Sequence, residues 1–61
     1  MTYTIYHRRV LLNNPDALGF AVIGQDNDGN TTLAHGTNPA YAFETHQAAQ
    51  DFIDNLERMK S

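Results

Sequence analysis

The sequence contains no cysteine and no tryptophan, and its one serine is the terminal Ser61. The missing cysteine excludes disulfides and thiolate metal sites, and it fits a reducing compartment such as the cytoplasm. Nucleophilic triads built on cysteine or on an internal serine are excluded as well. Threonines are present, but none lies in a recognisable catalytic motif. We therefore expect a protein that is not an enzyme, has no catalytic residues and needs no cofactor.

Long apolar runs are also missing. No stretch approaches the about 20 apolar residues that a membrane-spanning helix needs. The N-terminus lacks the basic region and apolar core of a signal peptide. The sequence therefore predicts no membrane association and a cytoplasmic location, which is the host cytoplasm if the protein is phage-encoded. At 61 residues the chain has room for one domain, residues 1–61.

Basic residues are few and confined to the two ends of the chain. Arg8 and Arg9 lie within the first twelve residues, and the other two lie within the last four. All seven acidic residues lie between Asp16 and Glu57, and the net charge is −3. This acidic middle disfavours phosphate-backbone binding, which depends on clustered Lys and Arg. It is compatible with a basic protein surface as the partner, and also with a plain solvated surface, which is the more common reason for such charge.

The strongest periodic pattern lies in the last third of the chain. Apolar residues recur there at spacings of three and four, which places them on one side of a helix. They are Ala49, Phe52, Ile53, Leu56 and Met59. Thr45 is a good N-cap, so we predict a helix from His46 to Lys60. Its opposite, solvent-facing side carries Asp51, Asp54 and Glu57.

Three shorter stretches have the composition of strands. Thr2 to Leu12 is rich in β-branched and aromatic residues. Ala17 to Gln25 alternates large and small side chains, and Thr31 to His35 follows an Asp28-Gly29 pair that suits a hairpin turn. Glycine at positions 19 and 24 indicates a bulge or a close backbone approach. Short loops then predict an antiparallel arrangement.

The predicted fold class is therefore α+β: a three-stranded antiparallel β-meander with one C-terminal amphipathic α-helix packed on one face. We place the large residues of the second strand, Leu18, Phe20 and Val22, beneath the helix. A single helix leaves the other face of the sheet uncovered.

Apolar side chains remain on this uncovered face in either register. The two possible sets are Tyr6, Val10, Ile23 and Ala34, or Tyr3, Ile5 and Leu11. A contiguous exposed patch of this kind marks an interface, whereas scattered surface hydrophobics are normal and need no explanation. A homodimer is the simplest use of such a face.

Metal binding is not expected. The turn Asp26 to Asn30 resembles the middle of a calcium loop, but both the first Asp and the bidentate Glu are missing. The three histidines, His7, His35 and His46, have no helical ligand spacing.

Nucleic-acid binding is the alternative function. His7, Arg8 and Arg9, flanked by Tyr3 and Tyr6, form the one basic-aromatic cluster. Some small sheet proteins insert strands into a groove of DNA. The alternative is therefore a small nucleic-acid-binding domain that uses Tyr6, Arg8 and Arg9.

The run Phe43-x-Thr45-x-x-x-Ala49-x-x-Phe52-Ile53-x-x-Leu56, after short strands, resembles short β-β-β-α proteins of bacteria and their phages. In size and acidity the chain is similar to phage-encoded inhibitors, anti-CRISPR proteins among them. The resemblance implies a phage or mobile-element protein that binds a host factor and blocks it sterically. The candidate binding residues are Tyr6, Arg8, Val10, Ile23, Asp51, Asp54 and Glu57.

Overall fold

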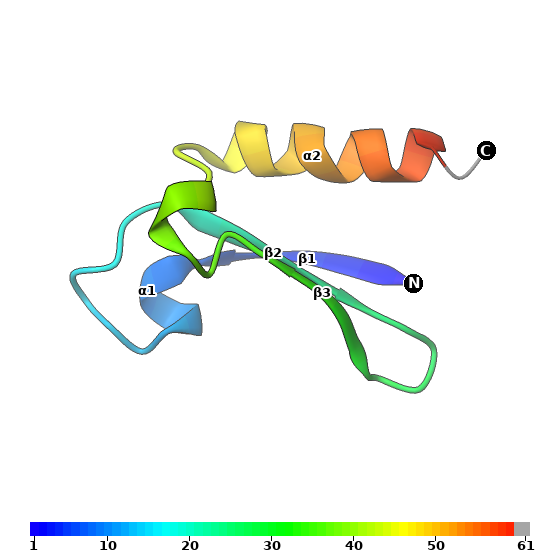
Figure 1. The fold of residues 1–61 in the computed structure, drawn as a ribbon, viewed down its shortest axis with the longest axis horizontal. Coiled ribbons are helices and arrows are strands. Elements are labelled where there is room, and N and C mark those ends of the chain that lie inside the picture. The colour runs from blue at the N-terminus through cyan, green and yellow to red at the C-terminus, as the bar shows by residue number, and fades with distance from the viewer. Residues whose placement is uncertain (60–61) are drawn as a thin grey trace.

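The computed structural model describes residues 1–59. In chain order its elements are β1 (Thr2–His7), α1 (Arg8–Leu11), β2 (Phe20–Gln25), β3 (Thr31–His35), the 3₁₀ turn η1 (Pro39–Tyr41) and α2 (His46–Met59). The strands form one antiparallel sheet in the order β1-β2-β3. Helix α2 lies along one face of this sheet, and α1 lies on the opposite side (Figure 1). The predicted α+β meander with a C-terminal helix is confirmed.

Helix α2 begins where its cap residue predicts. The Thr45 hydroxyl accepts a hydrogen bond of 3.0 Å from the Ala48 amide, which satisfies one free donor of the first turn. Ala49 and Ile53 pack against Val22 to form the centre of the core. Met59 was predicted on the same stripe but is 82% exposed. It lies about 80° around the helix axis from Ala49, at the margin of the stripe. The predicted last residue, Lys60, lies outside the described residues.

The register of the sheet decides which face the helix covers. Val22 pairs with Ile5 on one side and with His35 on the other. Because side chains alternate along a strand, Phe20 and Val22 lie beneath α2, as predicted. Leu18 was expected to join them, but β2 begins only at Phe20 and Leu18 is 75% exposed.

The prediction of a single strand over residues 2–12 is wrong, because the chain turns into α1 after His7. The His7 ring nitrogen Nδ1 accepts a hydrogen bond of 3.1 Å from the Arg9 amide and caps the helix. At the other end, Asn13 has a φ of 52°. The amides of Asn13 and Asn14 donate back into α1 at 3.3 and 3.1 Å. This pair of bonds is the Schellman termination, so local capping overrides the strand preference of the residues in between.

Beyond β3, a second segment completes the edge of β2. Phe20 and Phe43 exchange two backbone hydrogen bonds of 2.8 and 3.0 Å. Strand β3 ends at His35, opposite Val22, and Phe43 pairs with β2 beyond that point, opposite Phe20. The approach is close: a Cβ at Gly19, where φ is 93°, would lie 2.7 Å from the Phe43 carbonyl oxygen. The predicted close backbone approach at Gly19 is confirmed.

The predicted hairpin joins β2 to β3. The Asp26 carboxylate accepts 2.9 Å hydrogen bonds from the amides of Asp28 and Asn30, and Gly29 has a φ of 85°. The register shifts at Gly24 and Gln25, which confirms a bulge at the predicted glycine. The Asp26 carboxylate therefore adds to two backbone hydrogen bonds in the turn, from the Asp26 amide to the Asn30 carbonyl at 3.0 Å and from the Gly29 amide to the Asp26 carbonyl at 3.1 Å.

This carboxylate makes the hairpin sensitive to acid. Hydrogen bonding lowers the pKa of Asp26, with the Asn30 amide as the largest cause and the Asp28 amide adding to it. A lowered native pKa means that the stabilisation is present above the unfolded-state pKa and is lost as pH falls through the native value. We expect Asp26→Asn to reduce the free energy of unfolding most at neutral pH, and the difference from wild type to shrink in acid. Urea unfolding at several pH values measures this, and a difference independent of pH would contradict it.

Candidate binding surfaces

One face of the sheet is left uncovered by α2. We call it the open face. It consists of Thr2, Thr4, Tyr6, Ile23, Gln25 and Ala34. Tyr6 pairs with Ala21 across β1 and β2, and Ile23 pairs with Ala34 across β2 and β3. No member of the open face carries a charge. Of the two sets that the sequence left open, the structure selects the one with Tyr6, Ile23 and Ala34.

Helix α1 covers one end of this side of the sheet. Ala21 is fully buried there, and Ala17 is nearly so. Val10 was expected within the sheet itself, but it lies on α1 and is 73% exposed. Tyr6 and Ile23 therefore lie on the side of the sheet where α1, the helix that carries Val10, is placed (Figure 1).

Arg8 is held inside the protein rather than presented to a partner. It is 6% exposed. Its guanidinium donates hydrogen bonds to three backbone carbonyls: Gly36 at 2.8 Å, Leu18 at 2.9 Å and Thr37 at 3.1 Å. The side chain thus ties the start of α1 to two loops that are distant in sequence. Arginine suits this position because its planar fork offers several donors in fixed directions.

Arg9 is the exposed arginine of the predicted basic cluster. Its Nε and Nη2 atoms lie 3.4 Å from the two nitrogens of the His7 ring. With Arg8 buried, the cluster presents one guanidinium, beside His7. Both arginines lie in α1 rather than in the predicted first strand.

The predicted acidic binding residues lie on α2, on the side of the sheet opposite the open face. Asp51, Asp54 and Glu57 are all exposed on α2, and we call them the acidic helix face. Two carboxylates accept hydrogen bonds from residues one turn earlier: Asp51 from Gln47 at 2.9 Å and Asp54 from Gln50 at 3.0 Å. The sheet separates this surface from the open face, so one flat partner surface cannot contact both.

The histidines line an aromatic cluster between sheet and helix, which the sequence reasoning missed. His35 stacks on Phe52 with ring centroids 4.6 Å apart and contacts Phe43 at 5.3 Å. His7 and His46 meet Phe20 edge to face, at 5.0 and 5.9 Å. In the described part of the chain, no three His, Cys, Asp or Glu side chains lie close enough to hold a metal ion. The histidine rings therefore serve as packing groups here.

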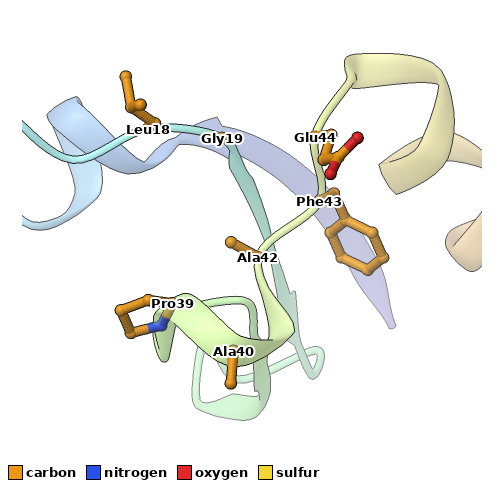
Figure 2. A pocket seen from close by; sticks show the side chains of 7 residues that line it. All are labelled: Leu18, Gly19, Pro39, Ala40, Ala42, Phe43 and Glu44. Carbon is orange, nitrogen blue, oxygen red and sulfur yellow. The ribbon is translucent and has the colours of Figure 1, made fainter.

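An open hollow lies beside the start of β2 (Figure 2). It is lined by Leu18, Gly19, Pro39, Ala40, Ala42, Phe43 and Glu44. The ring of Phe43 points away from Pro39 and Leu18 (Figure 2). Glu44 is the one charged lining residue, and a single carboxylate without a partner group provides no acid–base pair.

Within residues 1–59, no helix has the length and apolar character needed to cross a membrane. Comparison of the chain with protein-family models, curated proteins and solved structures finds no match.

Proposed function

We propose that the protein is a non-enzymatic binding module whose open face docks on another protein. The observation that carries the proposal is the contrast between its two layers. The open face has Tyr6, Ile23 and Ala34 among uncharged polar residues, whereas the helix layer carries three exposed acids. The centres of protein interfaces are depleted in charge and enriched in tyrosine. Burying the open face therefore costs little desolvation, while the acidic layer keeps the free protein soluble.

The mode of action we propose is steric blocking of a host factor by a phage or mobile-element protein in the host cytoplasm. Its support is the small size, the acidity and the resemblance described above. The acidic helix face is the second candidate surface, and it would suit a partner with a basic surface. The nucleic-acid alternative has weaker support. Arg8 is committed to three backbone carbonyls, so Arg9 is the one arginine that the cluster of His7, Arg8 and Arg9 exposes.

Two substitutions distinguish the surfaces. Ala34→Lys places a charge on the open face at an exposed position beside Ile23, and Asp54→Lys reverses a charge on the acidic helix face. The partner is first captured from nuclease-treated host lysate with the wild-type protein, and each variant is then titrated against it. We expect Ala34→Lys to weaken binding at least tenfold, which is about 1.4 kcal/mol, and Asp54→Lys to leave it nearly unchanged.

The pair controls for net charge. Asp54→Lys changes the charge by two and Ala34→Lys by one, so general electrostatics would affect the helix variant more. Loss of binding with Asp54→Lys alone would transfer the site to the acidic helix face. Retention of nucleic acid from untreated lysate, with a steep salt dependence, would instead support the alternative function.

A further inference from the structure

We propose that the outer edge of β1 pairs antiparallel with β1 of a second copy of the chain. Strand β1 is at the edge of the sheet, with β2 as its one neighbour among the described strands. An edge strand presents unpaired backbone groups that form a template for another strand. The sequence of β1, TYTIYH, contains no charged residue, proline or glycine.

The hydrogen-bond pattern shows which groups face outward. Arg8 continues the ladder after β1 by donating its amide to the Gly19 carbonyl at 3.0 Å. Hydrogen-bonded positions alternate along an antiparallel pair, so Thr4 and Tyr6 bond to β2. Ile5 therefore directs its amide and carbonyl to the outer edge, where no strand of residues 1–59 pairs with it.

The opposite edge of the sheet, strand β3, is protected against pairing with another strand, whereas the β1 edge is not. Strand β3 is interrupted by the register shift opposite Gly24 and Gln25, and bulges are a usual defence against edge pairing. Where β3 ends, Phe43 occupies the next position along β2. Strand β1 has neither device, although it is the longer edge, with six residues against five.

The outer edge of β1 is well suited to pair with β1 of a second copy of the chain. Pairing about a two-fold axis at Ile5 gives two hydrogen bonds between Ile5 and its copy. On the open face it sets Thr4 opposite Tyr6 of the other copy. These are uncharged β-branched and aromatic pairs, the favourable kind in sheets. The Ile5 side chain, half-buried beneath α2, would also be covered by its copy.

The hydrophobic core of this protein is small, so a dimer contact between β1 strands would add stability that the core does not provide. The described residues bury five hydrophobic side chains, three of which are alanines. Below about 70–80 residues a single core rarely contributes more than about 3–5 kcal/mol, and small natural proteins often add disulfides, a metal or oligomerisation. A disulfide is excluded here. The two-fold axis would stand perpendicular to the sheet. Both α2 helices would then lie on one side of a six-stranded sheet, and both open faces on the other.

The test uses the full chain, which is short enough for chemical synthesis. N-methylation of the Ile5 amide removes the outward donor and leaves the bonds between β1 and β2 in place. N-methylation of Asn27, exposed in the turn between β2 and β3, is the matched control. Sedimentation equilibrium over a roughly hundredfold concentration range measures the dimer by mass action. We expect a dimer for wild type and for the Asn27 analogue, and a monomer for the Ile5 analogue.

A second variant covers the case in which the Ile5 analogue does not fold. Thr4→Lys adds a charge at the exposed edge of the open face, and Thr31→Lys makes the same change on β3. We expect Thr4→Lys to raise the dimer dissociation constant at least tenfold and Thr31→Lys to leave it within about twofold. A wild-type chain that is monomeric at every concentration overturns the proposal, as does an equal effect of the two lysines. Partner binding through Ala34 is measured separately, so either proposal can fail while the other stands.

Discussion

Replacing Arg8 with methionine should remove a large part of the stability of this protein. The substitution keeps much of the apolar stem but leaves the carbonyls of Leu18, Gly36 and Thr37 without their donor. Hydrogen bonds to a charged group contribute about 1.5–3 kcal/mol each, although the sites will partly rehydrate. We expect a loss of about 3 kcal/mol, from a total of roughly 3–9 kcal/mol for a chain of this length. Urea unfolding followed by circular dichroism measures the change.

Two companion variants assign the effect to the hydrogen bonds. Arg9→Met removes the same charge from an exposed neighbour and should change stability by no more than about 0.5 kcal/mol. Arg8→Lys keeps the charge but replaces the planar fork with a single ammonium group, so its stability should lie between those of wild type and Arg8→Met. If Arg8→Met and Arg9→Met cost the same, the buried arginine does not hold the loops together.

Truncation of Ile53 is the second large effect we expect. Ile53 is 5% exposed and packs with Val22 and Ala49 at the centre of the core. Ile53→Ala removes buried methyl and methylene groups and leaves a cavity, which costs about 2–5 kcal/mol. In so small a core this change should lower the melting temperature by more than about 8 °C. Calorimetry of the purified variant measures the shift.

Met59→Ala is the matched control on the same helix. Met59 is an apolar residue of the predicted stripe, but it lies in solvent at the last turn. Its truncation should cost no more than about 0.5 kcal/mol. Equal losses from Ile53→Ala and Met59→Ala would contradict the placement of α2 on the sheet.

The elements that the sequence predicted well are those determined by local signals. Helix α2 has Thr45 as its cap and a regular apolar stripe, and the β2–β3 hairpin has the Asp28-Gly29 turn. Helix α1 was missed because its residues are typical of strands, and because the sequence signals that mark its two ends are weak. Asn13, Asn14 and Pro15 together mark a helix end, and His7 is a less usual cap. These four residues were the available evidence against a long first strand.

The role of Arg8 could not be predicted from its neighbours in sequence. Its acceptors lie 10, 28 and 29 residues away, in loops whose positions depend on the whole fold. The sequence predicted two alternative sets of residues for the uncovered face of the sheet. It could not choose between them, because alternation along a strand does not say which side a helix covers. Burial of Val22 beneath Ala49 and Ile53 decided between the registers and placed Tyr6 and Ile23 on the open side.

The central functional claim is that a partner contacts the open face. Methyl-group NMR tests it most directly, on protein labelled at alanine and isoleucine and titrated with the captured partner. We expect the methyl signals of Ile23 and Ala34 to shift or broaden first, while those of Ala49 and Ile53, enclosed between sheet and helix, stay in place. Backbone shifts confined to Asp51, Asp54 and Glu57, with Ile23 and Ala34 unchanged, would show that the partner binds the acidic helix face and that the claim is wrong.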